Sequence, residues 1–230
     1  MLLWYEVKFK PMNLCSGRSL FNSFQLGSFS SSLFRRRLSS GMPPNRPSTN
    51  LRRLVWIDCE MTGLDIEKDV LMEVAVIVTD SSLREVTPGI NLIIHQPDSI
   101  LNAMTEFPEE SHALTGLTEA CRASQIDLRN AEDQICRHIR QGLSGTTGTP
   151  LLAGNSVGHD LKFLQKYMPA VKDLLHYKIL DVSSINSCYQ LWNKSVLHQC
   201  PKKKRLHRAM EDIKESIEEM KVLKDIMFGA

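Results

Sequence analysis

Three apolar runs rich in β-branched residues, separated by polar stretches, occupy the part of the chain between residues 54 and 95. Runs of this kind are typical of strands, and we predict strands at Val55–Ile57, Leu71–Thr79 and Gly89–His95. The Asp80–Ser82 stretch between the second and third runs has the residue types of a hairpin loop. The pattern therefore predicts three strands that are antiparallel neighbours in one sheet.

The helical spacing of apolar residues dominates residues 98–142. We predict helices over Asp98–Thr105, around Glu109–Leu114, and over Leu128–Gln141. The Thr115–Thr118 stretch interrupts this region, and Thr118 is an expected N-cap.

Strand and helix patterns alternate in the last third of the chain. Leu151–Ala153 predicts a short buried strand, and the turn at Gly154–Ser156 leads into a helix. Tyr177–Val182 predicts the last strand, with Ser183 as the cap of the next helix, and the final helix is expected from about Ala209 to Met227. Strands followed by alternating helices and strands predict an α/β domain with a mixed sheet.

The first fifty residues differ in composition from the rest of the chain. The segment from Met12 to Thr49 contains no Asp or Glu, is rich in Ser and Arg, and carries scattered apolar residues. This composition is typical of a mitochondrial transit peptide, although a basic leader without an address shares it. We predict a disordered basic leader and linker over residues 1–50 and a folded domain over residues 51–230. An internal start at Met42 would give an untargeted form for the cytoplasm or the nucleus.

The formal net charge of +2 is unevenly distributed. Residues 1–53 carry nine Lys or Arg and one acid, which leaves a net charge of −6 on the remainder. An acidic domain argues against a long basic groove for polymeric nucleic acid, and it suits a pocket for metal ions and a small ligand. No run approaches eighteen consecutive apolar residues, so no membrane-spanning helix is expected. The six cysteines lack metal-site or disulfide spacing, which fits free thiols in a reducing compartment.

Two acidic residues end the first predicted strand. Residues two apart on a strand point to the same side of a sheet, so the carboxylates of Asp58 and Glu60 converge. Like charges this close are costly unless a cation lies between them, and Mg²⁺ or Mn²⁺ prefers oxygen ligands. Two acidic residues placed there by chance are the alternative. Glu73, inside the next strand, is either a further acidic wall or an edge residue facing solvent.

Further acidic residues and one histidine have a suitable context. Asp160 lies near the start of a helix that follows a strand, and Asp212 lies in the first turns of the last helix. His207, five residues before Asp212, reaches the same site only if it lies in the loop or cap before that helix. Two metal ions held by four carboxylates, with a histidine as proton acceptor, would suit phosphodiester hydrolysis. The alternatives are an ordinary helix N-terminal acid, a solvated first turn and a surface histidine.

The ordered set of motifs resembles a known family. The segments Asp58–Leu64, Gly154–Asp160 and His207–Asp212 resemble the three exonuclease motifs of the DEDDh exonucleases, most closely the oligoribonuclease branch. Met61–Leu64 and Tyr177–Ser183 are typical of that branch. The resemblance extends from about residue 54 to residue 228 and identifies 51–230 as an exonuclease domain.

The resemblance implies a ribonuclease H-like fold, with a five-stranded mixed sheet flanked by helices. It implies 3′→5′ hydrolysis of very short RNA, dinucleotides especially, to nucleoside 5′-monophosphates. It also implies a homodimer and two divalent ions, Mg²⁺ or Mn²⁺. The residues that it assigns to the metals are Asp58, Glu60, Asp160 and Asp212, with His207 as the general base.

Substrate contacts are also implied by the resemblance. Leu64 matches a residue wedged between the two bases, and Tyr177 matches a tyrosine contributed across the dimer interface. Ser156, Lys178 and Ser183 match positions that contact the 5′ phosphate, which would close the site to longer chains.

The sequence departs from the family pattern at several of these positions. Lys178 replaces an arginine, which keeps the charge but loses the bidentate fork, so we expect weaker phosphate binding. Phe107 stands where the family has a tryptophan near the site, and Glu211 replaces an aspartate. The alternatives are a broader DEDDh exonuclease on DNA or longer RNA ends, and an inactive module that binds dinucleotides.

Overall fold

The computed structural model describes residues 52–201 and 207–229, and for Glu106 and Phe107 it describes the backbone alone. The predicted leader over residues 1–50 and the internal start at Met42 lie outside the described residues. So does the side chain of Phe107.

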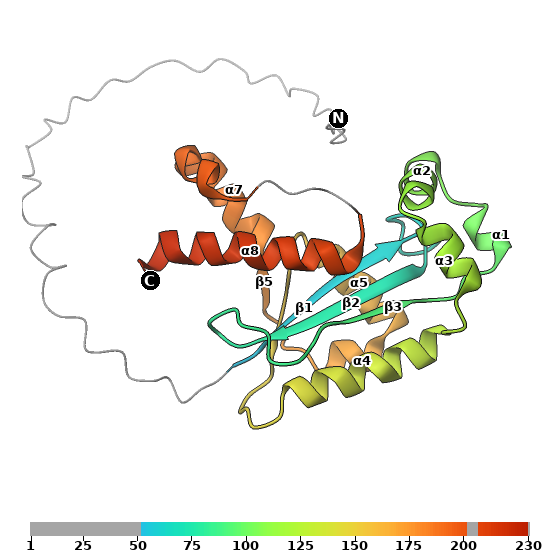
Figure 1. Cartoon of the computed structure of the whole chain (residues 1–230), viewed down its shortest axis with the longest axis horizontal. Coiled ribbons are helices and arrows are strands. Elements are labelled where there is room, and N and C mark those ends of the chain that lie inside the picture. Colours follow the sequence, from blue (N-terminus) through green and yellow to red (C-terminus); the bar gives the residue numbers. More distant parts are fainter. Residues whose placement is uncertain (1–51, 202–206, 230) are drawn as a thin grey trace, which may run out of the picture. The chain divides into compact units, whose positions relative to one another are not determined.

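The described residues form a five-stranded sheet in the order β3-β2-β1-β4-β5 (Figure 1). The strands are β1 (Leu54–Met61), β2 (Leu71–Thr79), β3 (Ile90–Ile93), β4 (Leu151–Gly154) and β5 (Ile179–Asp181). The β1–β2 and β2–β3 pairs are antiparallel, whereas the β1–β4 and β4–β5 pairs are parallel. The sheet confirms both the predicted mixed topology and the three antiparallel neighbours.

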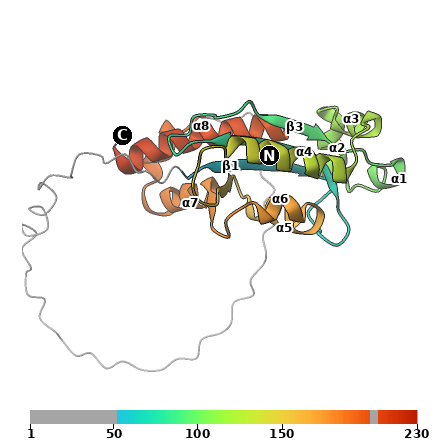
Figure 2. The same cartoon turned by 90° about the horizontal axis from the view of Figure 1, so that it is seen from below.

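Helices pack on both faces of this sheet. They are α1 (Asp98–Leu101), α2 (Glu106–Leu114), α3 (Leu117–Ala123), α4 (Leu128–Gly142), α5 (Gly158–Tyr167), α6 (Pro169–Asp173), α7 (Val182–Trp192), the 3₁₀ helix η1 (Lys194–Gln199) and α8 (Ala209–Phe228). The core on one face comes from α4, α5 and α6, and the core on the other face comes mainly from α7 and α8. Figure 2 shows α8 and α5 on opposite sides of the sheet. Within the described ranges, no helix combines the length and apolarity needed to span a membrane.

β1 is the central strand, which explains its continuous apolar sequence. Val55, Trp56 and Ile57 are at most 1% exposed, because strands lie on both sides of β1 and helices on both of its faces. Successive side chains alternate between the faces. Val55 and Ile57 join the core under α4 and α5, whereas Trp56 joins the core under α8. The Trp56 indole Nε1 donates to Thr79 Oγ1 at 3.0 Å, which satisfies its buried polar group.

Several predicted boundaries were too wide. The third strand contains only Ile90–Ile93 of the predicted Gly89–His95, and the last strand only Ile179–Asp181 of the predicted Tyr177–Val182. The helix predicted over Asp98–Thr105 ends at Leu101. Apolar spacing does not define ends, which depend on where the hydrogen-bonding partner stops.

Two predicted caps were wrong. Thr118 lies inside α3, because Gly116 adopts a left-handed backbone with φ of 72° and the helix begins directly after it. Asp181, rather than Ser183, caps α7 by accepting a hydrogen bond from the Ser183 backbone N–H at 2.9 Å. In both places a neighbouring residue of suitable type provides the helix start.

Close packing between α4 and β2 gives a test of the fold. A Cβ on Gly142 would lie 2.9 Å from the Cβ of Val78, which is fully buried. Gly142→Ala should therefore lower the free energy of unfolding by about 1–3 kcal/mol, because neither backbone can move freely. Urea denaturation would measure the change.

The matched control is Gly158→Ala at the start of α5. A Cβ there meets no atom within 4 Å, and the residue is helical. We expect this variant to be as stable as the parent or more stable by up to about 1 kcal/mol. Equal destabilisation by both variants would contradict the packing of α4 on β2.

Candidate active site

The pleat of β1 places Asp58 and Glu60 on the side of the sheet that α8 covers. Both follow Trp56 at intervals of two residues, and Trp56 packs in the α8 core. Asp58 pairs in register with Ala75 of β2 and Glu60 with Glu73. Both acids are half-buried. The two carboxylates therefore begin where the apolar part of the central strand ends.

Asp160 approaches the same strand end from α5. The parallel pairing of β4 with β1 stops at Trp56, whereas β1 continues to Met61. Beyond that point the Cys59 N–H finds its acceptor in the Asp160 carboxylate, at 2.9 Å from Oδ1. Asp160 is only 6% exposed, and this bond fixes its carboxylate beside the strand.

The start of α8 brings in the last two predicted residues. Arg208 is the N-cap, so His207 precedes the helix and Asp212 lies in its first turn, in agreement with the predicted geometry. Glu60, His207 and Asp212 each offer a ligand atom, and these atoms lie within 4.8 Å of one another. His207 has a φ of 50°, a left-handed conformation that costs energy for a residue with a side chain.

The site is electrostatically crowded. Burial, with the nearby carboxylates of Asp212, Glu73 and Asp160, raises the pKa of Glu60 to about 8, and Arg208 opposes that shift. Burial also raises the pKa of Asp160 to about 6. In both cases the charged form lacks solvation and lies close to other negative charges.

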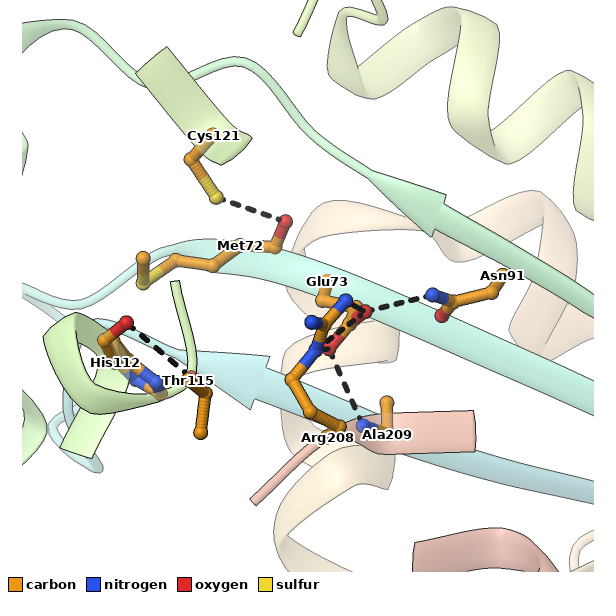
Figure 3. A network of polar contacts seen from close by, with 8 residues as sticks. All are labelled: Met72, Glu73, Asn91, His112, Thr115, Cys121, Arg208 and Ala209. Atoms are coloured by element: carbon orange, nitrogen blue, oxygen red, sulfur yellow. Dashed lines mark hydrogen bonds and ion pairs between the residues drawn. The ribbon is translucent and has the colours of Figure 1, made fainter. Parts of the chain in front are cut away.

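The structure excludes one of the two interpretations of Glu73, that of an edge residue facing solvent. Glu73 is completely buried on β2, which lies between β3 and β1, so it is not an edge residue facing solvent. Its carboxylate forms an ion pair with Arg208, at 2.8 Å between Oε1 and Nη2 (Figure 3). Sequence reasoning missed this pair, although an acid inside an apolar strand signals a buried partner.

The two serines predicted to contact phosphate share one neighbour. Oδ1 of Asp181 accepts hydrogen bonds from the Ser156 N–H at 3.0 Å and from the Ser183 hydroxyl at 2.7 Å. Ser156 has a φ of 56°, so a strained backbone lies here as well as at His207. Asp181 was not predicted, although an Asp at a strand end before a helix is a recognisable cap.

The turn that carries Leu64 is held by Asp69. The Thr62 hydroxyl donates to Asp69 Oδ1 at 3.0 Å, and the Asp65 N–H donates to Asp69 Oδ2 at 2.8 Å. A side chain on Gly63 would collide with the same carboxylate. Leu64 is 68% exposed at the tip. The Leu64 side chain is thus exposed to solvent on a turn that hydrogen bonds to Asp69 hold in place.

Tyr177 and Lys178 form a separate exposed group before β5. The Tyr177 ring stacks on His176 with centroids 4.4 Å apart, and Lys178 Nζ lies 5.8 Å from the Tyr177 ring centroid. Tyr177 is 82% exposed. Neither residue belongs to the group formed by Glu60, His207 and Asp212.

The donor set fits divalent cations. Carboxylate oxygens dominate it, as hard ions such as Mg²⁺ and Mn²⁺ require. A bound cation would also offset the burial and the nearby negative charges that raise the pKa of Glu60 to about 8. Of the four acids predicted to hold such ions, Glu60 and Asp212 belong to the group with His207, while Asp58 lies on β1 and Asp160 beside it.

Comparison with known proteins defines the class. The sequence profile of the exonuclease family RNase_T matches residues 55–220. The zinc-bound complex of Escherichia coli exonuclease I with single-stranded DNA is structurally similar, with a TM-score of 0.58 and 15% identity. The alignment covers 76% of this chain but only 41% of exonuclease I, so the likeness shows a shared ribonuclease H-like fold. A domain of this class implies divalent metal ions.

Relatives with higher sequence identity define the family within the exonucleases. Human mitochondrial oligoribonuclease is 45% identical over 177 residues, which cover 77% of this chain and 74% of the relative. An oligoribonuclease of Mycobacterium sp. strain KMS is 43% identical over 177 residues, with 77% and 82% coverage. The chain belongs to the oligoribonuclease family of exonucleases. This confirms the resemblance and the fold inferred from the three motifs.

The crowding around Glu60 leads to a test on the metal-free protein. Because folding raises this pKa from 4.5 to about 8, the folded state binds more protons than the unfolded state across that interval. Its stability should fall as pH rises through the interval. Glu60→Gln should lessen that loss and, in EDTA at pH 8, melt higher by roughly 3–8 °C. Thermal melts across the pH range would measure it.

Divalent ions should reverse this ranking. Added Mg²⁺ or Mn²⁺ should stabilise the parent more than Glu60→Gln, because the amide is a poorer ligand for a hard cation. Glu109→Gln, at an exposed position on α2, is the control and should melt like the parent in both conditions. If the melting temperatures of the parent and Glu60→Gln depended on pH in the same way, Glu60 would not have the raised pKa.

Proposed function

We propose that this protein is a 3′→5′ exoribonuclease that hydrolyses very short RNA, dinucleotides especially, to nucleoside 5′-monophosphates. The observation that carries the proposal is the convergence of Glu60, His207 and Asp212 within 4.8 Å at the end of β1, beside Asp160. Relatives named oligoribonuclease support RNA oligonucleotides as the substrate.

Two divalent ions, Mg²⁺ or Mn²⁺, would stabilise the charge that develops on the attacking and leaving oxygens of the phosphodiester. Asp58, Glu60, Asp160 and Asp212 hold them. His207 accepts the proton of the attacking water, for which an imidazole suits neutral pH. Its position ahead of α8 leaves the side chain exposed to solvent, so water and the proton both have access.

Length selection comes from fixing both ends of the substrate. Leu64 enters between the two bases, while Ser156, Lys178 and Ser183 bind the 5′ phosphate. A third nucleotide on the 5′ side would then collide with the groups that bind the terminal phosphate. The shared contact of both serines with Asp181 supports this, because it holds them at a fixed spacing.

We further propose that the protein acts as a homodimer in mitochondria. Tyr177 is 82% exposed, as expected of a residue that contributes to a partner's site. The Arg-rich leader, which has no Asp or Glu from Met12 to Thr49, and the mitochondrial name of the human relative support import. A form that starts at Met42 would remain in the cytoplasm or the nucleus.

Turnover of RNAs of two, five and twenty nucleotides, with Mg²⁺ present, tests the proposed substrate. The dinucleotide should be cleaved at least about 100-fold faster than the longest chain, since an extra nucleotide on the 5′ side would collide with the groups that bind the terminal phosphate. Asp212→Asn should lower the rate at least about 100-fold. Asp133→Asn, at an exposed position on α4, is the matched control and should be fully active.

Other outcomes would support other functions. Equal rates at every length, or equal rates on DNA, would indicate a broader exonuclease. Dinucleotide binding without metal-dependent release of mononucleotides would indicate an inactive binding module.

Lys178→Arg tests the phosphate contact. Restoring a bidentate guanidinium should lower the KM for a 5′-phosphorylated dinucleotide by roughly 3–10-fold and leave kcat unchanged. The dinucleotide without a 5′ phosphate should respond little. Lys172→Arg on α6 is the control and should change neither KM. A similar gain with and without the phosphate would exclude Lys178 as its ligand.

A further inference from the structure

Glu73 is a charged residue with no exposed surface, and its carboxylate accepts hydrogen bonds from β3 and from the start of α8. Arg208 donates through Nε to Oε2 at 3.1 Å and through Nη2 to Oε1 at 2.8 Å. Asn91 of β3 donates to Oε1 at 2.7 Å, and the Ala209 N–H donates to Oε2 at 3.2 Å. Figure 3 shows these donors converging on one carboxylate.

This carboxylate supplies a helix cap that the local sequence lacks. Arg208 is the N-cap of α8, and its side chain makes no capping hydrogen bond. A guanidinium has no acceptor, so it cannot satisfy the first N–H groups of a helix. Glu73 accepts the Ala209 N–H instead, and its negative charge lies at the positive end of the helix dipole.

The register of the sheet connects this helix cap to the candidate active site. Glu73 lies directly opposite Glu60 in the β1–β2 ladder. The same carboxylate therefore ties the strand pair that carries Glu60 to the helix start that carries His207 and Asp212. The strained backbone of His207, with φ of 50°, lies one residue before the ion pair. Such conformations persist only where neighbouring contacts determine them.

We propose that Glu73 and Arg208 are positioning residues, which hold His207 and Asp212 against Glu60 and keep the guanidinium away from the Glu60 carboxylate. The proposal rests on the catalytic roles given to His207 and Asp212 under the proposed function. Neither positioning residue needs to touch the RNA or a metal ion.

The second part of the proposal follows from charge. Glu73 lies opposite Glu60 in the β1–β2 ladder, and its carboxylate takes up the guanidinium hydrogen bonds of Arg208. If Glu73 lost its charge, the guanidinium would turn to the nearest carboxylate and compete there with a divalent ion. A carboxylate that binds Arg bidentately has fewer oxygen lone pairs left for a metal.

Single and double variants separate positioning from simple loss of stability. Glu73→Gln is isosteric and keeps an acceptor, yet it should lower kcat on a dinucleotide by roughly 10–100-fold with little change in KM. It should weaken Mn²⁺ binding, measured by calorimetry without substrate, by about 10-fold. The double variant Glu73→Gln/Arg208→Gln removes the competing guanidinium, so it should bind Mn²⁺ more tightly than the single variant.

Hydrogen exchange provides a measurement that does not depend on activity. In the metal-free protein, the amides of residues 209–213 should exchange about 10-fold faster in Glu73→Gln, because the helix start loses the negative charge of its tertiary cap and the ion pair with Arg208. The control is Arg122→Gln, which breaks an ion pair between α3 and Asp98 of α1 that shares no residue with the Glu73 network. Its metal affinity, kcat and exchange at residues 209–213 should match the parent.

The outcomes distinguish a positioning role of Glu73 and Arg208 from a purely structural one. Unchanged exchange, kcat and Mn²⁺ affinity in folded Glu73→Gln would overturn the proposal. So would a double variant that binds Mn²⁺ no better than the single one, because that is expected of a purely structural pair. If Glu73→Gln does not fold, Arg208→Gln decides: the loss of the ion pair should lower kcat on the dinucleotide, and an unchanged kcat would overturn the proposal. A parent that binds Mn²⁺ but cleaves no dinucleotide would refute the proposed function and leave the exchange test of the cap in place.

Discussion

Like charges held together at the end of the central strand are the constraint on which the rest of this site depends. Asp58, Glu60, Asp160 and Asp212 come from β1, α5 and α8, and burial together with the charges of Asp212, Glu73 and Asp160 raises the pKa of Glu60 to about 8. Such an arrangement stores repulsion that only a cation or a proton can relieve. The repulsion between these carboxylates destabilises the metal-free domain. A divalent ion that binds between them would remove this repulsion, and that relief would add to its binding free energy.

The elements that bring these acids together are fixed by polar contacts as much as by the core. The Cys59 N–H holds Asp160 beside β1, and the fully buried Glu73 holds the start of α8 through Arg208 and Ala209. A buried ion pair contributes little net stability, because desolvation offsets attraction. Its role here is to hold the start of α8, because the Glu73 carboxylate both pairs with Arg208 and accepts the Ala209 N–H.

Two further acidic residues hold the residues that are proposed to bind the substrate. Asp181 holds Ser156 and Ser183 through one oxygen, and Asp69 holds the turn under Leu64. In both places one carboxylate satisfies several donors. The acidic character of the domain is therefore divided between residues available to a metal ion and residues that satisfy backbone and hydroxyl groups.

The sequence by itself determined the sheet, the three motifs and the approach of His207 ahead of α8, because apolar periodicity and motif spacing are local properties. It did not determine the caps of α3 and α7, the buried state of Glu73 or the network around it. Glu73 and Arg208 are 135 residues apart, so no local pattern connects them. Only the tertiary structure, by setting β2 between two strands and α8 across it, decided that this glutamate is a buried anchor.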